Sequence, residues 1–103
     1  MPRPRPIHAY TLVLAGQRLF FVQFNEPLEL VPAGDVGNWQ WFWGGYLWVP
    51  NSVQIGASLV QLRPVRGAPS PGPDRISYDP PPQDVRALSD ARPALAFTDY
   101  PIT

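Results

Sequence analysis

The chain has 103 residues, of which 45% are hydrophobic and 16% are charged, and it contains 15 prolines, no cysteine and no lysine. Its length allows one small domain. Eight acidic side chains balance eight arginines, so the net charge is zero and no bulk field would attract nucleic acid or an anionic membrane. The missing cysteine and lysine exclude disulfides, thiolate metal sites and the lysine-dependent loop that binds nucleotide phosphates.

Composition divides the chain into three parts. Residues 1–6 are half proline, so we expect an extended N-terminal arm rather than a helix or an inner strand. Residues 7–62 hold most of the aromatic residues, with three prolines and four charges, which is the composition of a folding unit, here a β domain. Residues 63–103 hold nine prolines and three aromatic residues, which favours a long C-terminal extended arm. Removing residues 1–6 or 94–103 should weaken assembly and leave the β domain folded.

The first predicted hairpin lies at the start of the β domain. Residues 8–15 and 18–24 are rich in β-branched and aromatic side chains, which favours two strands. Between them lies Gly16-Gln17, a glycine-first pair that suits a two-residue type II′ turn. Alternation along the second strand then places three apolar side chains on one face, namely Phe20, Val22 and Phe24.

A second hairpin is predicted around Gly44-Gly45, which can supply both positive-φ positions of a type I′ turn. Residues 39–43 and 46–49 flank this pair with aromatic and apolar side chains. Residues 28–31 and 58–62 are weaker strand candidates, because proline, glycine and asparagine interrupt the surrounding sequence. Together these segments predict an all-β fold, a small antiparallel sandwich or partly open barrel of five or six strands.

The two arms carry features of their own. Residues 84–91 could form a short helix, because Asp84 can cap its start and Pro93 stops it. Three large apolar residues near the end of the C-terminal arm are spaced as anchors for partner pockets: Phe97, Tyr100 and Ile102. Two cations of the N-terminal arm would pair with acidic partner surfaces: Arg3 and Arg5.

The segment 38–49 stands out because six of its twelve residues are aromatic. Alternate residues of a strand share a face, so its tryptophans form a ladder, with an aromatic pair across the turn. The members are Trp39, Trp41, Trp43, Tyr46 and Trp48. Three interpretations stay open: the ladder is the core of the sheet, its four tryptophans are exposed and stack on sugar rings, or the aromatic side chains meet a neighbouring subunit.

The residues needed for catalysis do not form a set. His8 is the sole histidine, so a zinc site would need carboxylates from unrelated loops. Glu26 and Glu29 are a weak candidate for an acid–base pair, since two acids beside a proline are usual in a solvated turn. Glycine and proline also interrupt the longest weakly charged stretch, which disfavours a membrane-spanning helix. We expect no enzyme, no cofactor and no membrane span.

These features predict a structural subunit of a large assembly, whose arms staple neighbouring copies or another capsid or complex protein. The finer expectation is a location in the virion, as a cement or decoration protein or a head-to-tail joining protein of a tailed bacterial virus. One alternative is an extracellular carbohydrate-binding module that uses the tryptophan ladder on a glycan. Another is an accessory subunit of a cytoplasmic complex.

Overall fold

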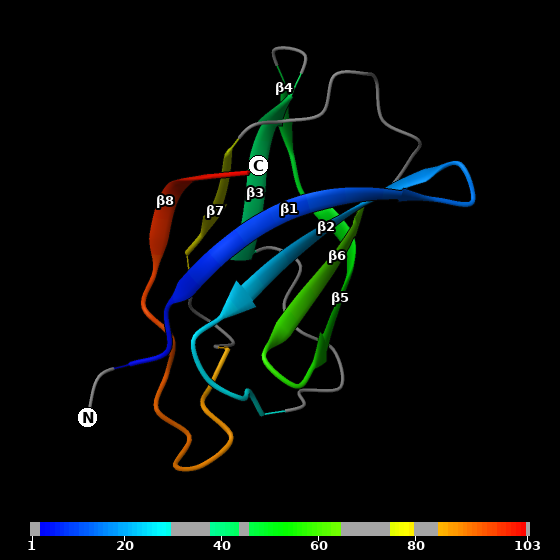
Figure 1. Cartoon of the computed structure of the whole chain (residues 1–103). Helices are drawn as coiled ribbons and strands as arrows, with labels where there is room; N and C mark the ends of the chain where they lie inside the picture. The colour runs from blue at the N-terminus through cyan, green and yellow to red at the C-terminus, as the bar shows by residue number, and fades with distance from the viewer. Residues whose placement is uncertain (1–2, 30–37, 44–45, 65–74, 80–84, 103) are drawn as a thin grey trace.

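Two four-stranded antiparallel sheets form the fold in the computed structural model, which describes residues 3–29, 38–43, 46–64, 75–79 and 85–102. The first sheet has the strand order β1-β2-β6-β5 and the second has the order β4-β3-β7-β8 (Figure 1). No α-helix occurs among the described residues, and the predicted all-β sandwich is confirmed. The strands are β1 (Pro6–Leu14), β2 (Gln17–Phe24), β3 (Trp39–Trp43), β4 (Tyr46–Trp48), β5 (Pro50–Gly56), β6 (Leu59–Pro64), β7 (Arg75–Tyr78) and β8 (Phe97–Pro101).

One apolar core lies between the sheets. Alternation turns Phe20 and Val22 of β2 inward, and Trp39 and Trp41 of β3 belong to the same buried cluster from the second sheet. The rings of Phe20 and Trp41 meet edge-to-face with centroids 4.4 Å apart, an arrangement that aromatic pairs prefer. The other buried members of the cluster are Ala9, Phe24, Leu28, Val53, Val60, Leu62, Ile76, Tyr78, Val85 and Ala94.

The first hairpin forms as predicted, but its turn lies one residue earlier. Leu14 pairs with Gln17, so the turn residues are Ala15 and Gly16, with φ of 50° and 78°. Two positive φ values are the pattern of a type I′ turn, whose twist matches that of the strands. The predicted type II′ turn at Gly16-Gln17 is therefore wrong: glycine occupies the second turn position, and alanine accepts the left-handed conformation at the first.

The second hairpin joins β3 to β4. Trp43 pairs with Tyr46, so the connection consists of positions 44 and 45, as the sequence predicts. Those two glycines lie outside the described residues, and their turn type stays a prediction.

The weaker strand candidates had mixed outcomes. The segment predicted at 58–62 is β6, which lies between β2 and β5. Its neighbour β5 was not predicted as a strand, because the proline and polar residues at its start read as a turn. In the segment predicted at 28–31, Leu28 forms a single antiparallel bridge with Ala87 instead of a strand, and residues 30 and 31 lie outside the described residues.

The C-terminal region contributes to the fold rather than forming an arm throughout. β7 pairs with β3, and β8 pairs with β7, which adds two strands to the second sheet. Ile76 and Tyr78 of β7 are buried in the core together with Val85 and Ala94. These two strands and β5 raise the number in the described chain to eight, above the five or six predicted.

The predicted helix at 84–91 is not formed by residues 85–91, and Asp84 lies outside the described residues. One helical hydrogen bond is present, from the Ala91 amide to the Ala87 carbonyl at 3.0 Å. The neighbouring amides donate to other segments instead, such as the Leu88 amide to the Pro27 carbonyl at 3.0 Å. Hydrogen bonds to distant segments thus take the place of those that would extend this single turn into a helix.

Three segments that are distant in sequence join at one end of the molecule, which we call the base: residues 3–5, 25–29 and 85–95. The Leu95 amide donates to the Pro4 carbonyl at 3.1 Å, and the Glu29 amide donates to the Arg86 carbonyl at 2.8 Å. Pro4 is fully buried. Residues 3–5 therefore pack against their own chain.

Candidate protein–protein interface

The β1–β2 hairpin extends beyond the sheet to which it belongs. β1 pairs with β2 along its whole length, whereas β6 pairs with β2 only over Phe20–Gln23. Residues 12–19, which we call the ribbon, are thus a two-stranded extension that projects to one side of the molecule (Figure 1). A two-stranded segment lacks the third strand or packed layer that normally supports a sheet.

The ribbon exposes apolar side chains on both faces. Leu12 is 48% exposed and Val13 is 58% exposed, and adjacent residues of a strand point to opposite faces. Val13 shares its face with Ala9, which is buried in the core, but it lies at the far end of β1 from the base. Arg18 is the one charged residue of the ribbon, and its Nη1 donates to the Thr11 hydroxyl at 3.0 Å. Leu19, opposite Leu12, is 5% exposed, so the large apolar side chains that the described part of the ribbon exposes are Leu12 and Val13.

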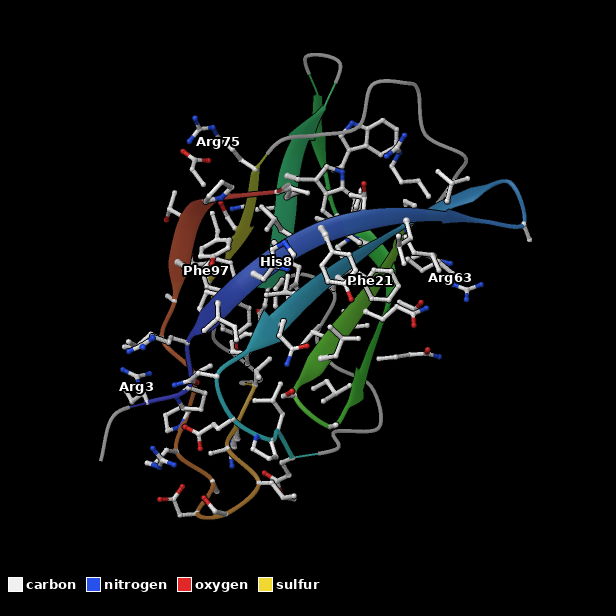
Figure 2. The ribbon with its side chains drawn as sticks, viewed as in Figure 1. Arg3, His8, Phe21, Arg63, Arg75 and Phe97 are labelled. Carbon is white, nitrogen blue, oxygen red and sulfur yellow. The ribbon has the colours of Figure 1, made fainter. Side chains whose placement is uncertain are left out.

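An aromatic strip continues this surface along the outer face of the first sheet. Tyr10 stacks on Phe21 with centroids 5.1 Å apart and an interplanar angle of 15°, and His8 lies 5.1 Å from Tyr10 (Figure 2). These side chains lie on the same face as Leu12, because alternate residues of β1 share a face. The exposed surface of β1 is therefore apolar and aromatic over most of its length.

The tryptophan ladder belongs to the core at the positions that the structure describes. Trp39 and Trp41 are 1% and 2% exposed, and Trp39 contacts the Tyr78 ring at a centroid distance of 4.6 Å. Neither residue can stack on a sugar or touch a partner, so the glycan-stacking and interface predictions are wrong for this pair. Trp48 is half-buried and packs on the same core. The side chains of two further predicted site residues lie outside the described part: Trp43 and Tyr46.

The predicted C-terminal anchors pack against their own core. Phe97 lies 5.9 Å from the Trp39 ring and 5.7 Å from both the Tyr78 and Tyr100 rings, measured between centroids (Figure 2). Tyr100 and Ile102 are also partly buried on this cluster. Their spacing was interpreted as reaching for a partner, but the second sheet of the same chain supplies the surface that they cover.

Arg3 of the predicted N-terminal arm has a similar outcome, whereas partner binding by the Arg5 side chain stays a prediction. Arg3 donates from Nε to the Pro93 carbonyl at 2.8 Å and from Nη2 to the Ala94 carbonyl at 3.1 Å (Figure 2). The backbone amide of Arg5 donates to Asn25 Oδ1 at 3.1 Å. Arg3 thus ties the base together instead of offering its guanidinium to an acidic partner.

A charged cluster in the base was not predicted from the sequence. Arg92 donates from Nη2 to Glu26 Oε1 at 2.7 Å and from Nε to the Asp90 carboxylate at 2.6 Å. The hydrogen bond from Arg92 lowers the pKa of the Asp90 carboxyl, and the same bond raises the pKa of the guanidinium. Arg92 and Glu26 are 66 positions apart, so no local pattern could have paired them.

The described residues contain no group of three or more histidine, cysteine, aspartate or glutamate side chains able to hold a metal ion. A shallow hollow of about 180 Å³ on the first sheet is lined by Gln54, Ile55, Gly56, Leu59 and Gln61, none of which is charged. No helix in the described chain is long and apolar enough to cross a membrane. Comparison with protein-family models, curated proteins and solved structures finds no match to the chain.

The ribbon is the surface that sequence reasoning missed. The segment 8–15 was predicted as a strand, but its exposure was not, although a signal was present. Apolar residues at Leu12 and Val13 are consecutive, so alternation cannot bury both on one face. Two adjacent apolar residues near a hairpin turn indicate a strand with no polar face.

Proposed function

We propose that the chain is a non-enzymatic structural subunit that joins other protein subunits through the ribbon. The observation that carries the proposal is the exposure of Leu12 and Val13 on an extension with one charged residue. Fully burying a side chain of this kind contributes about 1.5–3 kcal/mol, and about half of the Leu12 and Val13 surface remains for a partner to bury. A partner that covers the ribbon would also supply the third strand or layer that a two-stranded segment lacks.

The aromatic strip strengthens this proposal because it lies next to the ribbon. Tyrosine and other aromatic residues are enriched at the centres of protein interfaces, where charged residues are depleted. Tyr10 and Leu12 share the outer face of β1, so a partner resting on the ribbon would reach Tyr10 as well. The proposal thus replaces the predicted proline-rich arms with a regular hairpin as the element that reaches a neighbour.

A finer form of the proposal places the assembly in a virion, with the chain as a cement or decoration protein or a head-to-tail joining protein of a tailed bacterial virus. The small size, zero net charge and low charged fraction support it, since a subunit held in a lattice has its apolar surface covered by neighbours. Mass spectrometry of purified particles tests this form. If particles made in cells that express the chain do not contain it, the placement in a virion is wrong, whereas the proposal of a structural subunit is unaffected.

The subunit proposal is tested by sedimentation of the tagged full-length chain through a density gradient, using lysate of its own source. We expect the wild-type chain in heavy fractions and the double variant Leu12→Ser/Val13→Ser in the light fractions of a free chain. The matched control is Leu88→Ser/Leu95→Ser, which removes two exposed apolar side chains from the base and should sediment like the wild type. A wild-type chain that sediments as a free chain would overturn the proposal.

A further inference from the structure

The four edge strands of the described sheets differ in how they are protected against pairing with another chain. Natural edge strands are protected by shortness, by proline, by bulges or by charges. β4 has three residues, and β5 begins with Pro50 and an irregular register. β8 carries Asp99 at a φ of 55° and ends at Pro101. β5 is regular and uncharged from Ser52 to Gly56, but polar residues alternate with apolar ones along it, so none of these three edges offers a continuous apolar ladder to a partner.

β1 is the exception. Its register with β2 is irregular at Pro6, but from His8 to Leu14 it is regular, and this stretch contains no charged residue. His8 and Ala9 make further interactions within the chain, and Ala9 is fully buried. The part of the edge that extends past them is residues 10–14, which includes the start of the ribbon. An unprotected edge of this kind is a template for a further strand.

The sequence of this edge complements itself in an antiparallel register. A two-fold axis at Leu12 would place Leu12 opposite Leu12 of the second copy and Thr11 opposite Val13. Both pairs are of apolar or β-branched residues, which favour cross-strand contact, and no charge meets a like charge. Each exposed apolar side chain of the ribbon would then gain a cross-strand neighbour, Leu12 on one face and Val13 on the other, and the pairing has the isologous pattern of a two-fold dimer.

Resting on the proposed function, we propose that the partner at this edge is a second copy of the chain. Two copies pair their β1 strands antiparallel about Leu12, and two four-stranded sheets become one continuous sheet. A strand pairing of five residues on each side buries less surface than a standard interface, which buries about 800 Å² per partner. We therefore expect the isolated dimer to be weak and to dissociate on dilution. Repeated contacts in an assembly would stabilise it.

The absence of cysteine allows a direct test by site-specific cross-linking of the full chain. Directly opposed residues of an antiparallel pair lie at Cα separations of about 4.5–5.5 Å, within the range that a disulfide spans. We expect air-oxidised Leu12→Cys to form disulfide-linked dimer at about tenfold the yield of the exposed control Leu88→Cys, because pairing raises the effective thiol concentration. Equal yields from the two variants would overturn the proposal.

The register has its own test. Thr11→Cys and Val13→Cys should each cross-link poorly alone, whereas an equimolar mixture should yield the mixed dimer. Sedimentation velocity of the wild-type chain should show a monomer–dimer equilibrium that shifts with concentration. A wild-type chain that stays monomeric at every concentration would overturn the proposal, yet it would leave intact a heavy complex seen in the lysate gradient. Dimers without Leu12→Cys cross-links would place self-association on another surface.

Discussion

The base and the ribbon lie at opposite ends of β1, and they differ in what covers them. In the base, short irregular segments exchange hydrogen bonds across the chain and bury Pro4 and Ala94, although Leu88 and Leu95 stay exposed. In the ribbon the ladder is regular and Leu19 is buried, but Leu12 and Val13 are half exposed. Burial therefore depends on whether a second layer lies over a segment, and regular secondary structure neither ensures nor requires it.

The largest expected effect is the loss of the folded state when the C-terminal residues next to the base are deleted. Deleting residues 94–103 removes β8 together with the core residues Ala94 and Phe97, and we expect a loss of about 5 kcal/mol or more, comparable with the whole stability of a small domain. Cooperative thermal unfolding monitored by circular dichroism should then disappear. If residues 94–103 were part of a free arm, as composition predicts, their deletion would not lower the stability of the domain. A deletion variant that still folds would therefore support the prediction of an arm.

The matched deletion shortens the ribbon. Removing residues 13, 14, 17 and 18 keeps the Ala15-Gly16 turn and the pairing of Leu12 with Leu19. We expect a stability change below about 1 kcal/mol, because Val13 is exposed and Arg18 lies outside the buried cluster. A large loss here would mean that the ribbon supports the fold and would contradict its description as an uncovered extension.

The next effect concerns the tie between the base and the second sheet. The Tyr78 hydroxyl accepts a hydrogen bond from the Val85 amide at 2.7 Å, and both residues are buried. Tyr78→Phe leaves this amide without its acceptor, so we expect a loss of about 1–3 kcal/mol in urea unfolding. Tyr100→Phe, on the partly buried edge of the same cluster, is the control and should cost less. An unchanged midpoint for Tyr78→Phe would show that the base is held by other contacts.

A smaller effect of opposite sign is expected at the turns. Ala15 in the ribbon and Ala91 in the base have φ of 50° and 59°, a conformation that glycine adopts without penalty. Ala15→Gly and Ala91→Gly should each raise stability by up to about 1 kcal/mol, since the relief of left-handed strain exceeds the added chain entropy. Ala96→Gly, at an exposed position without positive φ, should lower it. A loss at Ala15 or Ala91 would contradict the turn geometry.

The smallest effect is a pH dependence that comes from the Asp90 carboxyl in the base. The lowered pKa of Asp90 means that its carboxylate form is favoured in the folded state, so its stabilisation is present above the unfolded pKa of 3.8 and is lost as the pH falls through the folded value. The pair is exposed, so the change is small and salt-sensitive. Thermal unfolding should show this acid loss in the wild type and less of it in Asp90→Asn. The same dependence of unfolding temperature on pH in both proteins would show that Asp90 does not contribute to the loss of stability in acid.

Sequence reasoning succeeded where the signal is local. β2 and β3 were found from alternation and aromatic content, and the first hairpin was placed within one residue of its turn. β7 and β8 were missed because their apolar residues stand singly among prolines and polar residues. The candidate interface was missed for a related reason. The pattern shows that Leu12 and Val13 are apolar, but it does not show whether the neighbouring strands are long enough to pack beside them.

The sequence by itself determined the all-β class and the position of the hairpins, the first to within one residue of its turn, because period-two alternation and turn chemistry act between neighbouring residues. The tertiary structure alone decided that the tryptophans at 39 and 41 are core, that residues 3–5 and 93–95 pack onto one another, and that Leu12 and Val13 stay exposed. Such contacts join residues as distant as Arg3 and Pro93, which are 90 positions apart. Whether a proline-rich segment reaches outward depends on the free energy of every surface available to it, and the nearest surface here belongs to the same chain.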